Sequence, residues 1–255
     1  MPLPPAPVAL PQARFDRLDA LRGLAIVWMT VFHFCFDLSY YGWLKADFLG
    51  DPFWWVQRGA IVSLFLFCAG VGQAVAWHQG QSWPRFWRRW AQVAGCAVLV
   101  TAGSALMFPR TYIFFGVLHG IAVMLVVARL TAGWGRGLWL AGAAAFAIKF
   151  IADQVHLVWP GAQFLDEKAF SWLGLVGRLP VTEDYVPVFP WLGVVWWGMA
   201  TGQWLLARRP SWLEGVLPAQ AAPLAWLGRW SLSWYMLHQP VLIGAMTAWV
   251  TWVRG

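Results

Sequence analysis

Long apolar runs, separated by short polar or basic segments, recur along the whole chain. A helix that crosses a membrane needs about 20 mostly apolar residues, and about seven runs approach that length. The pattern therefore predicts an all-α, polytopic transmembrane helix bundle with about seven spans. The expected spans are residues 20–42, 53–77, 91–108, 112–130, 137–157, 189–207 and 230–252.

Two segments depart from this pattern. Residues 1–13 are rich in proline and predict a disordered cytoplasmic tail, ahead of a single transmembrane domain that covers residues 14–255. Residues 158–188 are acidic and include an apolar stretch too short to span, so we expect a re-entrant or interfacial segment there. Lys149 and Asp153 lie four residues apart in the fifth span and are expected to pair with each other.

The distribution of basic residues predicts the orientation of the spans. With the N-terminus in the cytoplasm, eleven of the 18 lysines and arginines fall on the inner side and seven on the outer side. Cytoplasmic loops of membrane proteins carry the excess of Lys and Arg. We therefore expect the N-terminus inside and the C-terminus outside.

Composition agrees with the membrane class and explains the net charge. The chain is 60% hydrophobic and 11% charged and contains 22 tryptophans, whereas about 25% of the residues in a soluble domain are charged. The formal net charge of +7 follows from basic inner loops, so we expect no nucleic-acid partner. Cys35, Cys68 and Cys96 all lie in apolar segments, which argues against a disulfide framework.

One face of the first span is polar. Arg22 and His33 are eleven residues apart, which returns them to nearly the same face of a helix at about 100° per residue. His33 and Asp37 are one turn apart, so the carboxylate is expected to orient the imidazole and increase its basicity. The complete stripe is Asp19, Arg22, Ile26, Thr30, His33 and Asp37.

Three histidines are expected near the middle of the membrane. His33 and His238 lie about 13 and 8 residues from the inner ends of their spans and His119 about 7 residues from an outer end, depths that agree within about 10 Å. Ionisable residues at this depth are costly and mark functional sites by default, although a packed, hydrogen-bonded interior residue is the simpler alternative. Ser231 and Tyr235 share a helix face with His238. The candidate catalytic residues are His33, Asp37, His119 and His238.

Arginines flank the inner ends of the first three spans. The planar guanidinium donates hydrogen bonds in pairs to phosphate, so these side chains are candidates to bind a phosphate-rich cytosolic ligand. Topology and lipid headgroups are the simpler explanation. The candidates are Arg14, Arg17, Arg22, Arg85, Arg88 and Arg89.

A second group of candidates is expected on the outer side. Asp184 and Tyr185 precede the sixth span, and Arg58 lies near the outer end of the second. A solvated loop explains the acidic residues, and the alternative is a site that recognises an amino or hydroxyl acceptor. Arg58 is also a candidate to pair with Asp37, which lies at a similar depth.

Four blocks of the chain resemble one family. In chain order they are RLDALRGLAIVWMTVFHFCFDL, GVLHGIAV, FPWLGVVWWGMATG and LGRWSLSWYMLHQPVLIG. They are similar to the bacterial branch of the heparan-alpha-glucosaminide N-acetyltransferase catalytic-domain family. The opening Arg-x-Asp-x-x-Arg-Gly also resembles the wider superfamily of membrane acyltransferases that O-acetylate cell-surface sugars.

The resemblance implies transfer of an acetyl group across the membrane from cytosolic acetyl-CoA. Arg22 and His33 match the functional pair of the sugar O-acetylating relatives. The chain departs from the animal lysosomal enzymes, which carry an essential histidine in the first lumenal loop and an asparagine at the position of His33. This chain has no histidine between residues 34 and 77. Either His33 takes the catalytic role, or the chemistry differs.

We therefore expect an acyltransferase of the bacterial inner membrane, surrounded by lipid and without a metal. It would transfer acetyl from acetyl-CoA to an amino or hydroxyl group of a sugar or cell-envelope glycan. The alternatives are a proton-coupled transporter that uses the intramembrane histidines, a b-type haem protein and a purely structural membrane partner. The sequence leaves the oligomeric state open.

Overall fold

The fold is that of a computed structural model, which describes residues 15–48 and 50–254. Helices form the framework of this described part, where β structure is limited to one isolated parallel bridge between Phe115 and Tyr185. The all-α prediction is confirmed. The expected tail, residues 1–13, and Arg14 lie outside the described residues.

Seven long helices coincide with the seven apolar runs. They are α1 (Asp16–Tyr40), α2 (Pro52–His78), α3 (Trp83–Met107), α4 (Val117–Leu130), α5 (Gly137–Val158), α7 (Trp191–Arg208) and α10 (Ser231–Arg254). Short helical segments lie between some of them. These are η1 (Ala132–Trp134), η2 (Pro160–Asp166), α6 (Lys168–Ser171), α8 (Ser211–Glu214), η3 (Ala219–Ala221) and α9 (Ala222–Arg229).

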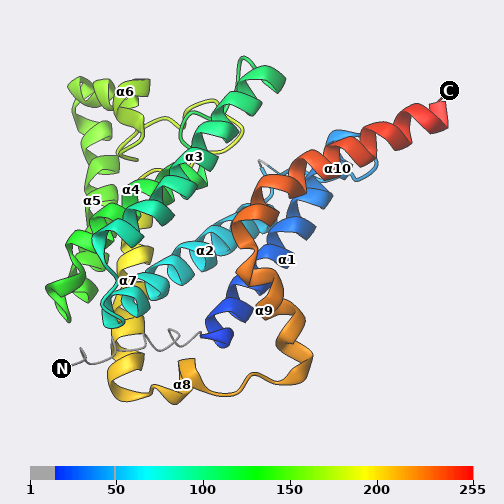
Figure 1. Cartoon of the computed structure of the whole chain (residues 1–255). Helices are drawn as coiled ribbons and strands as arrows, with labels where there is room; N and C mark the ends of the chain where they lie inside the picture. The colour runs from blue at the N-terminus through cyan, green and yellow to red at the C-terminus, as the bar shows by residue number, and fades with distance from the viewer. Residues whose placement is uncertain (1–14, 49, 255) are drawn as a thin grey trace, which may run out of the picture.

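Four of the long helices, α1, α2, α3 and α5, are long and apolar enough to cross a membrane. Helix α4 has 14 residues, or about 21 Å at about 1.5 Å per residue, against a hydrocarbon core of about 30 Å. Helix α10 contains Pro240 and bends along its length (Figure 1). Length and composition thus make this a membrane protein, and a topology with seven spans stays a prediction.

Carboxylates mark the start of two helices. Asp51 accepts a hydrogen bond from the Phe53 amide at 2.9 Å at the start of α2. Asp184, from a distant part of the chain, accepts one from the Val117 amide at 2.7 Å at the start of α4. Negative charge is favourable at a helix N-terminus, where amides lack intrahelical partners. The second contact fixes the segment before α7 onto α4.

Glycines let two pairs of helices pack with their backbones in contact. A Cβ at Gly70 would lie 2.1 Å from the Val195 carbonyl oxygen, which places α2 directly on α7. A Cβ at Gly23 would lie 1.9 Å from the Leu224 carbonyl oxygen, so α9 packs on the first half of α1 in the same way. Small residues at such contacts are typical of helices that associate within lipid.

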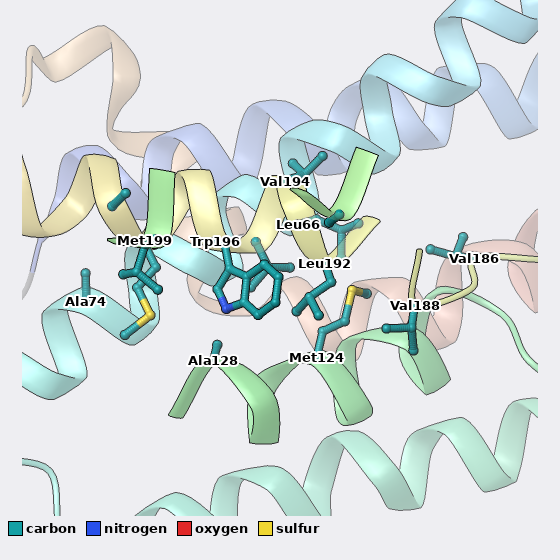
Figure 2. Close-up of a cluster of buried hydrophobic side chains, with 14 of the residues drawn as sticks. Leu66, Ala74, Met124, Ala128, Val186, Val188, Leu192, Val194, Trp196 and Met199 are labelled. Carbon is teal, nitrogen blue, oxygen red and sulfur yellow. The ribbon is translucent and has the colours of Figure 1, made fainter. Parts of the chain in front are cut away.

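The main core lies between α2, α4 and α7 (Figure 2). Leu66, Met124 and Met199, one from each helix, are fully buried there. In contrast, Leu106 on α3 is 86% exposed and Leu140 on α5 is 76% exposed. Large apolar side chains left uncovered along these helices are suited to contact with lipid tails.

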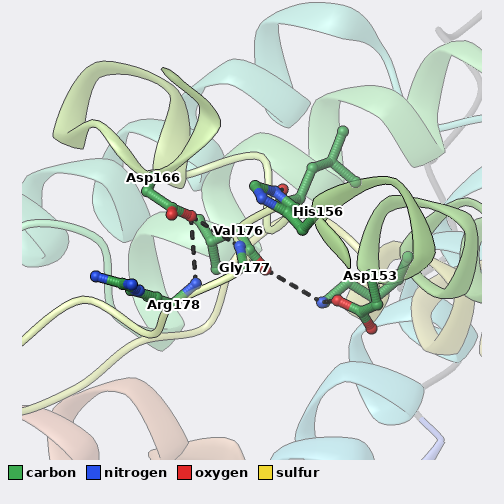
Figure 3. A network of polar contacts seen from close by, with 8 residues as sticks. Asp153, His156, Asp166, Val176, Gly177 and Arg178 are labelled. Atoms are coloured by element: carbon green, nitrogen blue, oxygen red, sulfur yellow. Dashed lines mark hydrogen bonds and ion pairs between the residues drawn. The ribbon is translucent and has the colours of Figure 1, made fainter. Parts of the chain in front are cut away.

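The segment between α5 and α7 is fixed at one end of the bundle, opposite α8 (Figure 1). Lys149 of α5 pairs with Asp153, as predicted, and also donates to the Val176 carbonyl at 3.4 Å. Asp166 accepts a hydrogen bond from the Gly177 amide at 2.7 Å (Figure 3). These contacts hold the segment as a folded cap over the ends of α4 and α5.

Candidate active site

The first and the last long helices meet at a pair of histidines. Nδ1 of His33 on α1 lies 2.6 Å from Nε2 of His238 on α10, and the two rings are within 13° of parallel. His238 is only 7% exposed, and its Nδ1 lies 2.7 Å from the Tyr235 carbonyl oxygen. The sequence placed these histidines at similar depth, and the fold brings them into direct contact.

Asp37 does not orient His33 as predicted. Its Oδ1 accepts a hydrogen bond from Nε2 of Gln239 at 2.8 Å, and its Oδ2 is buried with no hydrogen-bond partner among the described residues. The predicted contact is wrong because α10 packs against this face of α1 and supplies both partners. His238 contacts the imidazole, and Gln239 contacts the carboxylate.

The suggested pair between Arg58 and Asp37 is also wrong. Nη2 of Arg58 lies 3.6 Å from Oδ1 of Asp184. The other carboxylate oxygen of Asp184, Oδ2, accepts the hydrogen bond from the Val117 amide at the start of α4. The Arg58 side chain is 45% exposed, so this ion pair leaves much of the guanidinium available. Arg58 and Asp184 are therefore paired with each other at the start of α4.

Tyr185 has a structural contact. Its hydroxyl donates a hydrogen bond to the Ser171 carbonyl at 2.5 Å, and its backbone forms the bridge to Phe115. Burial raises the pKa of this hydroxyl above its usual range, and the Asp166 carboxylate raises it further. The phenol therefore stays protonated and serves as a donor to the backbone.

Both ring nitrogens of His119 are engaged. Nδ1 accepts a hydrogen bond from the Gly116 amide at 3.2 Å, which caps α4. Nε2 lies 3.0 Å from Oγ1 of Thr101, and this hydroxyl donates its proton to the Ile113 carbonyl at 2.8 Å. Nε2 must therefore be the protonated nitrogen. These contacts fasten α4 to α3, and a catalytic role for His119 remains a prediction.

The opening motif of α1 joins this helix to α8 and α9 at one end of the bundle. Asp19 is 5% exposed and accepts from Arg22 at 2.9 Å. Arg229, which ends α9, pairs with Asp16 at 2.7 Å and lies 3.9 Å from Asp19. The Arg17 guanidinium donates hydrogen bonds to the backbone carbonyl of Ser211 at 3.1 Å and to those of Trp212 and Val216. Arg17 thus caps α8, a role that helical spacing did not indicate.

The other inner arginines differ in what they contact. Arg22 reaches across to α2, where a Cβ at Gly72 would lie 2.5 Å from its Nη2. Arg85, Arg88 and Arg89 are exposed in the first turns of α3. Arg22 is therefore held in place, whereas the exposed arginines of α3 can change conformation to fit a bound ligand.

Two surface cavities lie at opposite ends of the bundle. One of about 160 Å³ is lined by Arg110, Tyr112, Asp166 and Lys168, beside the segment that carries Asp184. The other, of about 310 Å³, lies between the ends of α2 and α7. Neither is lined by His33 or by the candidate inner arginines.

Sequence reasoning missed three members of this arrangement. Gln239 and Arg229 are not among the candidate residues that the sequence suggested. The third is the Tyr235 carbonyl, a backbone group that no side-chain pattern can indicate. The one available signal was adjacency, since Gln239 follows His238 directly.

Together these features define an all-helical membrane protein that holds a histidine pair between its first and last long helices. The family profile for heparan-alpha-glucosaminide N-acetyltransferase, catalytic, matches residues 14–240, and the chain belongs to this family. The match includes every candidate site residue. The family resemblance is thus confirmed, and the family is one of membrane acetyltransferases whose members use acetyl-CoA as donor. Searches of curated proteins and of solved structures gave no match.

Proposed function

We propose that this protein is an acetyltransferase of the bacterial inner membrane, with seven spans and a cytoplasmic N-terminus. It takes acetyl from cytosolic acetyl-CoA and delivers it to an amino or hydroxyl group of a sugar or envelope glycan at the outer face. The observation that carries the proposal is the histidine pair, within a chain that belongs to an acetyltransferase family. The excess of inner basic residues supports the orientation.

His33 is the residue that handles the proton or the acetyl group. In one route it takes a proton from the acceptor while the acceptor attacks the thioester carbonyl. The C–S bond breaks, a C–N or C–O bond forms, and the proton passes to the CoA thiolate. In the other route His33 attacks the thioester carbonyl, the C–S bond breaks and CoA thiolate leaves. The acceptor then attacks the acetyl-imidazole, the C–N bond to His33 breaks, and the proton of the acceptor passes by way of the freed imidazole to the thiolate. General base catalysis is typically worth about 10²–10⁴-fold in rate.

The donor docks at the inner end of the bundle. The Asp19 contact orients Arg22, and Arg85, Arg88 and Arg89 are exposed on α3, so four guanidinium groups are suited to the phosphates of CoA. Arg17 is less suited, because its donors are used on the carbonyls that follow Ser211. Arg14 completes the proposed set.

The acceptor is recognised on the outer side. Arg58 pairs with Asp184 and leaves 45% of its side chain exposed, which suits it to bind an oxygen of the acceptor or of the reacting carbonyl. Asp184 holds Arg58 in position, and Tyr185 shapes the surrounding segment. The cavity lined by Arg110, Tyr112, Asp166 and Lys168 gives this outer face a hollow of about 160 Å³.

The test compares purified wild type with His33→Ala and Arg22→Ala in detergent. We expect saturable acetyl-CoA binding that weakens about tenfold in Arg22→Ala and is kept in His33→Ala, since loss of a charge-assisted hydrogen bond costs about 1.5–3 kcal/mol. Release of CoA thiol with glucosamine as probe acceptor should fall at least 100-fold in His33→Ala.

Two results would overturn the proposal. One is full turnover in His33→Ala. The other is absence of acetyl-CoA binding at millimolar concentration together with substrate uptake into vesicles, which would favour the transporter.

A further inference from the structure

The histidine pair has a defined hydrogen-bond direction. The Tyr235 carbonyl oxygen can only accept, so Nδ1 of His238, 2.7 Å away, is the protonated nitrogen. In the neutral ring Nε2 of His238 is then an acceptor. Nδ1 of His33, 2.6 Å from that atom, must supply the hydrogen. The remaining nitrogen of His33, Nε2, therefore carries a free lone pair.

We propose that His238 is the positioning residue of the reaction, which holds His33 in the tautomer that presents Nε2 to the reacting groups. This inference rests on the proposed function and adds a role for the last helix. It differs from the orienting carboxylate that the spacing of His33 and Asp37 suggested. In a nucleophile–base–orienter series the third group orients the base, and here the neutral imidazole of His238 would orient His33.

The proton balance follows from this direction. Nε2 of His33 takes the proton of the acceptor amine or hydroxyl. Nδ1 of His33 keeps its own proton, which stays hydrogen-bonded to Nε2 of His238. The ring is then an imidazolium whose second N–H points at a neutral acceptor, which stabilises the positive charge. As the thioester C–S bond breaks, Nε2 returns the proton to the thiolate and the neutral tautomer is restored. The proton thus passes from the acceptor to the CoA thiolate through Nε2 of His33, and no other protein group gains or loses one.

Burial separates the roles of the two rings. His238 is 7% exposed, whereas His33 is partly exposed, and we assign the contact with the reactants to His33. Two further contacts hold α10 on α1 on either side of the pair. Trp234 donates to Thr30 at 2.9 Å, and Gln239 donates to Asp37 at 2.8 Å. The helix that carries His238 is thus fixed one turn before and one residue after it.

His238→Gln and His238→Leu separate hydrogen bonding from packing. The glutamine amide can donate to the Tyr235 carbonyl through its nitrogen and accept from Nδ1 of His33 through its oxygen. Leucine fills similar space and does neither. Trp249→Phe, at a 54% exposed position of the same helix, is the matched control. Acetyl-CoA binding and CoA release with glucosamine are measured for each variant.

We expect kcat to fall at least 100-fold in His238→Leu, with KM for acetyl-CoA within about threefold of wild type, because the donor binds elsewhere. His238→Gln should keep kcat within about tenfold, and Trp249→Phe should match wild type. If His238→Leu fails to fold, His238→Gln decides by itself. Its kcat within tenfold supports the inference, and a kcat as low as that of His33→Ala overturns it.

Two other outcomes are distinguishable. Wild-type kcat in His238→Leu overturns the inference and leaves the proposed function standing. A wild-type protein that neither binds acetyl-CoA nor releases CoA removes the proposed function, and the role of His238 with it.

Discussion

Arg22 reaches from α1 to α2, where its guanidinium lies against the backbone of Gly72. Its Nη1 is held by Asp19 at 2.9 Å. Only a residue without a side chain leaves this space open. Gly72 is therefore part of the arrangement that positions Arg22, although it has no polar group of its own.

Gly72→Ala should weaken acetyl-CoA binding without unfolding the protein. The new Cβ would lie 2.5 Å from Nη2, and the flexible arginine can move away while the helices stay in place. We expect Kd for acetyl-CoA to rise roughly three- to tenfold, less than or equal to the rise in Arg22→Ala. Binding can be measured by titration calorimetry.

The control is Gly95→Ala on α3, where no atom lies within 4 Å of the added Cβ. An unchanged Kd in Gly72→Ala, beside a raised Kd in Arg22→Ala, would mean that Arg22 does not bind the donor from this position.

The sequence predicted part of the site at this scale. His33 and His238 could be placed at one depth, because depth follows from the distance along a helix to its end. The partner of Asp37 could not be predicted, because it depends on which helix packs on α1 and at what rotation. Local spacing favoured His33 as the partner, and the real partner, Gln239, comes from a helix about 200 residues later.

At the scale of elements, α2 and α7 lie backbone to backbone in the main core. Gly70 faces the Val195 carbonyl with no space for a side chain. Small residues of the second apolar run, Gly70 among them, permit this close packing. What the run could not indicate is that the partner is α7, a helix that begins more than a hundred residues later.

Gly70→Ala should destabilise the fold. Alanine is the better helix former by about 0.8–1.0 kcal/mol, but its Cβ would lie 2.1 Å from a backbone oxygen that cannot rotate away. Overpacking of this kind typically costs about 1–3 kcal/mol. We expect a clearly lower thermal unfolding temperature in detergent.

Gly59→Ala is the matched control on the same helix, since nothing lies within 4 Å of its added Cβ. It should unfold at or slightly above the wild-type temperature. Equal unfolding temperatures for the two variants would show that α2 and α7 are not held this closely.

At the scale of the whole molecule, the two ends of the bundle differ in character. One end carries the arginines of α1, α3 and α9, and the other carries the segment fixed by Asp166 and Asp184. Long apolar runs predicted the helices well, because each run is one element. They could not predict that α4 is only 14 residues long, because the carboxylate of Asp184 sets its start.

The proposed orientation predicts which surface residues are accessible from outside the cell. Glu167 and Arg208 are both exposed, near opposite ends of the bundle. In a variant without native cysteines, Glu167→Cys should react with a membrane-impermeant maleimide in intact cells. Arg208→Cys should react only after the membrane is permeabilised. The reverse pattern of labelling would invert the orientation and move the donor arginines to the outer face.

The histidine pair joins the first long helix to the last, and this has a consequence for biosynthesis. A nascent chain inserts α1 early, yet His33 has no second imidazole beside it until α10 has left the ribosome and docked. A chain that extends through α9 but ends before α10 already carries the arginines of α1, α3 and α9 and still lacks the histidine pair. Under the proposed function such truncated copies would bind thioester without consuming it, and turnover would begin only in chains whose final helix has been inserted.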